Sequence, residues 1–301
     1  MRKLIPILFA GFLLLVLALP AGTWKWRTHG GVYGSRGIAV VAHERLRNDP
    51  NPTVASTVGN LKFEIIRPGS KVPDTWRQEP YFLYDPPLAP RDHIMTSSRD
   101  AGVGWLELAQ AARTAPGGPY WDNVSYYLGI ASHFWAHVTE YTEHDNARTY
   151  YENLYPLDPD AAYQAWAEKS NHLKWQAEYY RPKDPALIVQ DGGPYANLDS
   201  FITAAQAQIN IFIENTMPTG NPMGGWLGDW IKSRKCEDSS YPHPGGEHYG
   251  AKELIDMATE LVYSGWVYAL GIQNSVSADR ITWSRWWSRE HREPGVVYIS
   301  F

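Results

Sequence analysis

Three histidines, His133, His137 and His144, lie within a short segment of this 301-residue chain, with Glu140 and Glu143 between them. At 100° per residue, positions 133, 137, 140 and 144 share one face of a helix. Imidazole and carboxylate groups are common zinc ligands, so the segment predicts a metal site. A straight helix separates His133 from His144 by roughly 16 Å, which favours two or three ions over one.

The alternative for this segment is an ordinary solvated helix face. No Lys or Arg occurs between positions 121 and 147, which is unusual for such a face. The opposite side of the same helix carries an apolar stripe that predicts contact with a core. The stripe consists of Val124, Leu128, Ala131, Trp135 and Val138.

Helical periodicity dominates the rest of the chain and predicts an all-α fold. A Pro-rich segment at 49–98 is predicted to be a long loop, because its prolines interrupt regular elements. Strand-like alternation is convincing nowhere, with a weak trace only at 295–301. Helices are expected at about 31–47, 104–114, 121–145, 160–180, 199–215 and 248–271.

The N-terminal residues 1–23 have a basic start, an apolar centre and a small-residue end, the pattern of a secretory signal peptide. A retained membrane anchor over 4–21 is the alternative, since that run is just long enough to span a bilayer. We therefore expect an exported protein with three parts: residues 1–23, a main domain at 24–271 and a tail at 272–301. Cys236 is the only cysteine, so no internal disulfide can form.

Net charge and aromatic content constrain the partners. Loss of Arg2 and Lys3 with the signal peptide takes the formal charge from −5 to −7, which disfavours nucleic acid as a partner without excluding it. The chain has 14 tryptophans and 19 tyrosines, which suit either a helical core or contact with lipid. Trp283, Trp286 and Trp287 lie beside arginines in the tail and make a peripheral membrane contact one expectation.

Further candidate ligands are scattered along the chain. Trp24 and His29 lie at the expected mature N-terminus, and Asp74 ends the phrase Gly69-Ser70-Lys71-Val72-Pro73-Asp74. His93 follows the Pro-rich segment, and His172 lies in the helix expected at 160–180. His43, in contrast, lies in the middle of the first predicted helix and is expected to be exposed rather than a ligand.

Taken together, these residues resemble the zinc-dependent phospholipase C family and its relatives, the single-strand-specific zinc nucleases. The family carries a phrase like His-Phe-x-x-Asp-x-Thr-x-x-x-His-Asp, and His133-Phe134, Thr139 and His144-Asp145 match it. The phrase ending at Asp74 matches the segment that supplies the family's active-site carboxylate. Trp24 and His29 match an N-terminal Trp and the His that follows it. The resemblance covers most of residues 24–271.

The resemblance implies an all-α, multi-helix domain with long loops around a metal cleft that holds two or three Zn²⁺ ions. It further implies an exported, monomeric phosphodiester hydrolase that cleaves a phospholipid into diacylglycerol and a phosphorylated head group. Asp74 would orient or deprotonate the attacking water. The implied metal ligands are Trp24, His29, Asp74, His93, His133, His137, His144 and His172.

The chain departs from the family pattern at several positions. His137 stands where the family has an Asp that bridges two zincs, Tyr81 replaces a loop His, and Gln176 replaces a carboxylate. His93 is a candidate substitute for the loop His, and Glu140 or Glu143 for the lost carboxylate. Two alternatives therefore stay open: a single-strand-specific nuclease, and a catalytically degenerate exported binding protein whose remaining metal is structural.

Overall fold

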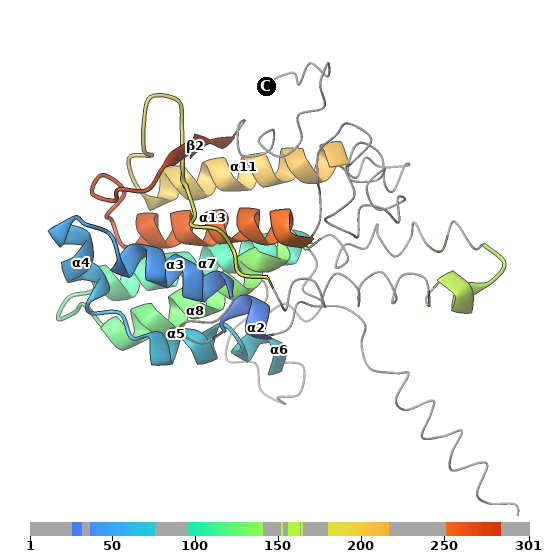
Figure 1. Ribbon diagram of the computed structural model, residues 1–301, viewed down its shortest axis with the longest axis horizontal. Helices are drawn as coiled ribbons and strands as arrows, with labels where there is room; N and C mark the ends of the chain where they lie inside the picture. Colours follow the sequence, from blue (N-terminus) through green and yellow to red (C-terminus); the bar gives the residue numbers. More distant parts are fainter. Residues whose placement is uncertain are drawn as a thin grey trace, which may run out of the picture.

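The computed structural model describes residues 26–31, 37–75, 95–140, 152, 156–162, 164, 180–216 and 251–283 (Figure 1). This part of the chain is mostly helical, as the sequence predicts. The helices are α2 (Trp26–His29), α3 (Ile38–Arg47), α4 (Pro52–Val58), α5 (Phe63–Gly69), α6 (Val72–Thr75), α7 (Met95–Thr114), α8 (Trp121–His137), α11 (Leu198–Thr216) and α13 (Ala251–Ala269), and the strands are β1 (Leu187–Val189) and β2 (Arg280–Thr282).

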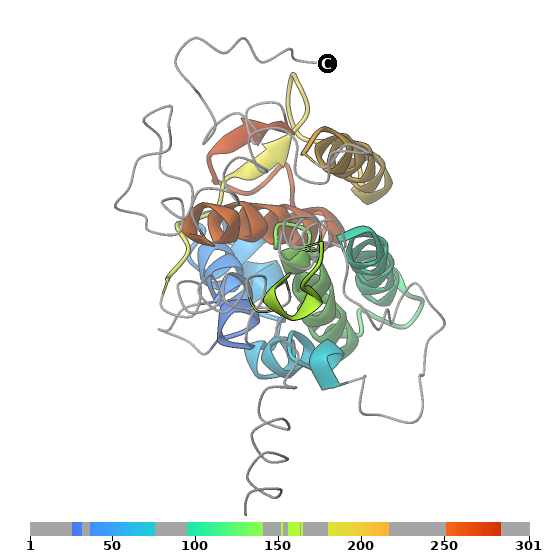
Figure 2. The ribbon, with the colours of Figure 1, turned by 90° about the vertical axis from the view of Figure 1, so that its right-hand side faces the viewer.

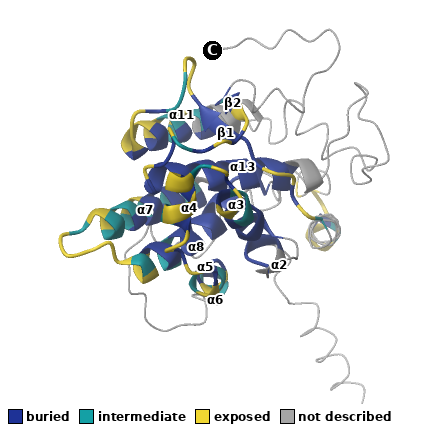
Figure 3. Ribbon diagram, turned by 60° about the vertical axis from the view of Figure 1, so that its left-hand side comes forward, coloured by how far each residue is buried: buried dark blue, intermediate teal, exposed yellow. Residues whose placement is uncertain are grey.

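Helix α13 lies in the middle of the fold. The two strands and α11 lie on one side of it, and α3, α7 and α8 lie on the other (Figure 2). Figure 3 shows that α8 and α13 are buried along most of their length, whereas α4 exposes one face. A helix that is apolar on most sides is expected in the interior of a domain of this size.

Small residues allow the three inner helices to come close to each other. Trp135 of α8 lies between Gly102 of α7 and Gly265 of α13, and a Cβ added at Gly265 would lie 2.6 Å from the indole Cζ3. The indole nitrogen of Trp135 donates a hydrogen bond to the carbonyl of Arg99. The apolar stripe predicted on α8 is confirmed, since all of its members are buried.

The segment predicted as a long Pro-rich loop contains three short helices, α4, α5 and α6. A proline is compatible with the start of two of them, because Pro52 is the first residue of α4 and Pro73 is the second residue of α6, where no amide donor is needed. The side chain of Asn51 accepts a hydrogen bond from the amide of Thr53 at 2.9 Å and caps α4. Prolines in this segment therefore limit helix length rather than prevent helices.

The strands form a two-stranded parallel sheet, in which Leu187 pairs with Arg280 and Val189 pairs with Thr282. The sequence does not predict them, because three residues are too few to show alternation and β1 is buried throughout. The amide of Ile188 donates a hydrogen bond to Ser264 Oγ at 2.9 Å, which attaches the sheet to α13.

Residues 272–283 do not behave as the tail that the sequence predicts. Ile272, Val276, Ile281 and Trp283 are buried, and Trp283 stacks on Phe201 with ring centroids 6.0 Å apart. Trp283 is therefore part of the packed fold, while residues 284–301, with the other tryptophans of the expected membrane contact, lie outside the described residues. The signal peptide or anchor at 1–23 lies outside them as well. In the described part of the chain, no helix is both long enough and apolar enough to cross a membrane.

Candidate metal centre

His29, His133 and His137 form a buried cluster, and none of them exposes any surface. Each offers one ring nitrogen, and these nitrogens all lie within 4.8 Å of one another. The rings face each other closely, with centroids 4.3 Å apart for His29 and His133 and 4.9 Å apart for His29 and His137. The structure thus brings together three of the ligands that the sequence predicts.

Helix α8 supplies two of these histidines. His133 and His137 are one turn apart, so they point to the same side of the helix. His29 ends α2, a short helix that packs against both α3 and α8. The site is therefore assembled from segments about one hundred residues apart in the chain.

The ring of His133 is oriented by a backbone carbonyl. Its Nδ1 lies 2.9 Å from the carbonyl oxygen of Ser70. Because a carbonyl only accepts, the ring donates through Nδ1–H, and in a neutral imidazole the other nitrogen, Nε2, then carries a lone pair. This tautomer is the one that a metal ligand needs at Nε2.

A carboxylate lies beside the ring of His137. The ring Nδ1 lies 2.9 Å from Oε2 of Glu140, whose side chain is 2% exposed. The two atoms are close enough for an ion pair, but they do not have the geometry of a hydrogen bond, so this contact does not fix the tautomer of His137. A carboxylate beside a metal-binding histidine is a frequent arrangement, because it raises the basicity of the ligand.

The two Nε2 atoms meet at 3.2 Å. Without a metal, Nε2–H of His137 can donate to the lone pair on Nε2 of His133; with a metal, both nitrogens can present a lone pair to the ion. Two nitrogens bound at about 2.0–2.1 Å to one tetrahedral zinc lie about 3.3 Å apart. The spacing and the donor set of the residues present therefore fit a metal ion.

Asp74 adds a carboxylate at the edge of this cluster. Its Oδ1 lies 3.8 Å from Nε2 of His133, and its side chain is 29% exposed while the His133 side chain is fully buried. Asp74 belongs to α6, which packs against α8. It is thus a partly exposed carboxylate beside a fully buried histidine.

Glycines explain how the Ser70 carbonyl and Asp74 come so close to α8. Gly69 at the end of α5 faces Gly129 of α8, and a Cβ added at Gly129 would collide with the carbonyl oxygen of Ile66. Next in the chain, Ser70 Oγ donates to the carbonyl of Arg67 at 2.8 Å and closes the turn that leads into α6. Residues 69–74 therefore pack against α8 as one structural unit.

The helix predicted at 121–145 ends earlier than expected. Helix α8 ends at His137, and the amide of Glu140 donates to the carbonyl of His137 at 3.0 Å in a turn. Thr139 stabilises this turn, because its hydroxyl donates to the carbonyl of Leu254 on α13 at 3.0 Å. Glu140 thus reaches the cluster from a turn, so its predicted place on the helical face is wrong, and the predicted place of His144 on that face lies outside the described residues.

Four predicted ligands, Trp24, His93, His144 and His172, lie outside the described residues. His43 is a different case, since the sequence predicts it as exposed but the structure buries it to 3% exposure, in a hollow that none of the three clustered histidines lines. The role of Ser70 was missed, because it acts through a backbone carbonyl that no side-chain pattern marks. Compared with known proteins, the chain matches no family model, no curated protein and no solved structure.

Proposed function

We propose that the protein is a zinc-dependent phosphodiester hydrolase similar to the zinc-dependent phospholipases C. The observation that carries the proposal is the convergence of His29, His133 and His137, with Asp74 at the solvent side. The same four residues match the family's N-terminal His, its helical His, its metal-bridging position and its active-site carboxylate. The proximity of these residues, which lie far apart in the chain, supports the proposal.

Zinc is the ion that best fits the donor set. Imidazole nitrogens suit Zn, Cu, Fe and Ni, and a set of three histidines with a further position open is typical of catalytic zinc. When bound, the ion would polarise a phosphoryl oxygen and lower the pKa of water to about 7. A ligand from outside the described residues is the candidate to complete the coordination, which leaves Asp74 to act on water.

The protein residues divide the remaining work. His29, His133 and His137 would hold the ion, the Ser70 carbonyl would keep the ring of His133 in the tautomer that binds metal, and the Glu140 carboxylate would place a negative charge beside the ring of His137. Asp74 is the group best placed to accept a proton from water at the solvent side, since it combines partial exposure with proximity to His133.

For the substrate, we propose a phospholipid phosphodiester. The net charge of the chain is negative, so it does not attract polynucleotides in general, and nuclease activity is the less favoured proposal. Peripheral contact with a membrane is part of this proposal, because a phospholipid substrate lies in one. Head-group selectivity would then depend on residues around the mouth of the site.

A second candidate function follows from the burial of the cluster. All three histidines are completely buried, and structural zinc sites are closed whereas catalytic ones keep an open position. The exposed part of Asp74 favours the catalytic reading. An exported binding protein with a structural metal remains the alternative to be tested.

The test compares Asp74→Asn with His137→Ala in turnover of a chromogenic phosphodiester by zinc-loaded protein. We expect Asp74→Asn to keep the metal and lose about 10²–10⁴-fold in turnover, and His137→Ala to lose both. Asp122→Asn, a change at an exposed carboxylate on α8, is the control. Wild-type protein that binds zinc without any turnover would support the structural alternative. Lipid vesicles and single-stranded DNA then distinguish the two hydrolase readings.

A further inference from the structure

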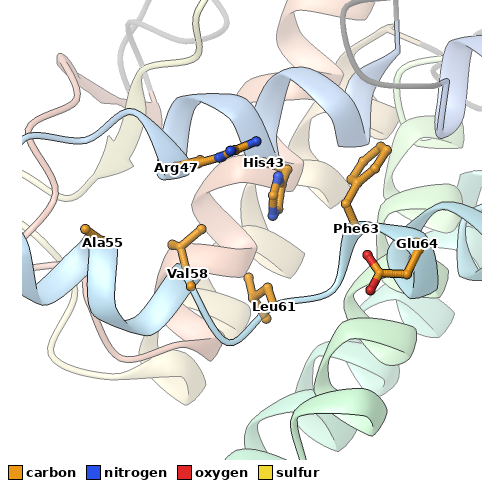
Figure 4. A pocket seen from close by; sticks show the side chains of 8 residues that line it. His43, Arg47, Ala55, Val58, Leu61, Phe63 and Glu64 are labelled. Carbon is orange, nitrogen blue, oxygen red and sulfur yellow. The ribbon is translucent and has the colours of Figure 1, made fainter.

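A second hollow lies apart from the metal centre. A cavity of about 410 Å³ opens between α3, α4 and the start of α5, and its walls include His43, Arg47, Val58, Leu61, Phe63 and Glu64 (Figure 4). None of the clustered histidines lines it. Its volume falls within the range of small-molecule sites, about 300–1,000 Å³.

Apolar side chains form one part of this pocket. Val58, Leu61 and Phe63 are 3%, 7% and 5% exposed, so they belong to the core and hold the wall in place. The ring of Phe63 lies 5.4 Å from that of His43, at an angle of 43°. Pockets that bind small organic molecules are typically lined by aromatic and aliphatic side chains of this kind.

Charged and polar groups define the two ends of the pocket. His43 and Arg47 are one turn apart on α3 and share its pocket face, while Glu64 comes from α5. In Figure 4, Arg47 and Glu64 lie on opposite sides of His43, with Phe63 on the side of Glu64. Burial, and secondly the Arg47 charge, lower the pKa of His43 to about 4, so its imidazole is neutral at pH 7.

We propose that this pocket binds a small zwitterion, with its anionic group beside Arg47 and His43 and its cationic group beside Glu64 and Phe63. A simple anion would meet the charge of Glu64, and a simple cation would meet that of Arg47. A zwitterion satisfies both and gains from the attraction of a cation to an aromatic face. This site goes beyond the proposed hydrolase and does not rest on it.

The first test is calorimetric titration of phosphocholine into the full-length protein as purified, with Arg47→Gln titrated alongside, so that phosphate bound by a metal appears as binding that this variant leaves unchanged. We expect saturable 1:1 binding, with inorganic phosphate and choline each at least tenfold weaker. Absence of phosphocholine binding, or equal binding of phosphate alone, would overturn the proposal. Failure of phosphodiester turnover in the separate experiment above would leave this result unaffected.

Variants then locate the binding. Arg47→Gln and Glu64→Gln change exposed residues, so folding is expected to be retained and is checked by circular dichroism. Each is expected to weaken phosphocholine binding at least tenfold. Arg181→Gln, which removes an exposed ion pair with Glu44, and Glu107→Gln on α7 are matched controls outside the pocket. Unchanged affinity in both pocket variants would contradict the assignment.

Phosphatidylcholine vesicles distinguish the source of the ligand. Vesicle binding that Arg47→Gln removes would identify the ligand as a lipid head group. Binding of soluble phosphocholine without vesicle binding would identify a free zwitterion. Vesicle binding that persists in both Arg47→Gln and Glu64→Gln, together with no binding of soluble phosphocholine, would refute the pocket as its cause.

Discussion

Glu140 places a negative charge beside His137, since its Oε2 lies 2.9 Å from the ring Nδ1. The change Glu140→Gln removes the negative charge but keeps the shape of the side chain. We expect zinc affinity to fall about 10–100-fold, because a carboxylate next to a metal-binding imidazole raises the basicity of the ligand. Competition with a fluorescent zinc chelator measures this. Glu107→Gln serves as the control, and equal affinity of Glu140→Gln and wild type would exclude this effect of the charge.

His43 makes stability depend on pH. Its pKa is lowered from 6.5 to about 4, first by burial and then by Arg47, so the folded state resists protonation. Above pH 6.5 the ring is neutral in both states. As the pH falls from 6.5 towards 4, the unfolded chain takes up a proton that the folded chain does not. The free energy of unfolding should decrease over this window, by at most about 3 kcal/mol.

Urea unfolding at pH 7.5, 6 and 5 tests this dependence, with His43→Gln as the comparison. The variant should lose less stability than wild type between pH 7.5 and 5, because it lacks the titrating group. Other histidines titrate in both proteins, so the difference between the two slopes isolates His43. Identical slopes would contradict the burial of a neutral imidazole.

The identity of the candidate metal-binding residues was the part of the site that could best be predicted from the sequence. His29, His133, His137 and Asp74 could be named from sequence, because few side chains bind metal and their types are conspicuous. The burial of His43 was not predictable, because α4 and the start of α5 cover it and the sequence predicted a loop there. The orienting carbonyl of Ser70 was not predictable either, since every residue has one.

At the scale of elements, the contact between α5 and α8 sets the position of the site. Gly129→Ala should destabilise the protein by about 1–3 kcal/mol, because the new Cβ would collide with the carbonyl oxygen of Ile66. The displaced α5 would also move the Ser70 carbonyl away from His133, so zinc affinity should fall with stability.

Gly59→Ala is the matched control for this prediction. Gly59 has φ −58°, a conformation open to alanine, and an added Cβ would meet nothing closer than 3.2 Å. Denaturant unfolding and zinc competition on both variants provide the comparison. If Gly129→Ala has the same free energy of unfolding and the same zinc affinity as Gly59→Ala, then neither stability nor metal binding requires the close approach of α5 and α8.

The positions of α11 and α13 were predictable, because apolar residues recur at helical spacing over their whole length. The end of a helix was less predictable where contacts with distant parts of the chain determine it. Helix α8 ends at His137 because Thr139 bonds to Leu254, which lies 115 residues further along the chain. Local sequence around 138–145 contains no helix breaker that would mark this end. The strands β1 and β2 escaped prediction for a similar reason, because each is three residues long and depends on its partner.

At the scale of the whole molecule, Asp49 joins the beginning and the end of the described fold. Its carboxylate accepts hydrogen bonds from the Ser277 amide at 2.7 Å, the Ser277 hydroxyl at 3.1 Å and the Asn51 amide at 3.0 Å. Asp49→Ala should cost about 2–3 kcal/mol of stability, because three hydrogen bonds to a buried, charged acceptor would be lost.

Thermal or urea unfolding measures the effect of Asp49→Ala. The control is Asp122→Ala, which removes only an exposed ion pair with Lys62 and should change stability by less than about 1 kcal/mol. Equal stability of the two variants would show that the junction between Asp49 and Ser277 contributes little. The junction also explains why residues 272–283 belong to the domain rather than to a tail.

The all-α class was predictable from composition and period, but the way in which distant segments meet was not. His29, the 69–74 phrase and α8 converge only once α2, α5 and α6 pack against α8. The resemblance to a known family was the one guide to this convergence, and His29, His133, His137 and Asp74 do meet. Physical reasoning from spacing alone instead predicted a single-helix site.

The most direct test of the account is the zinc content of the purified protein, measured by elemental analysis for wild type and for the double variant His133→Ala/His137→Ala, alongside chelator-sensitive turnover of a chromogenic phosphodiester. We predict at least one tightly bound zinc and chelator-sensitive turnover in wild type, and the loss of both in the double variant. Wild-type protein without bound zinc, or a double variant with undiminished zinc and turnover, would contradict the assignment of these histidines as the metal centre.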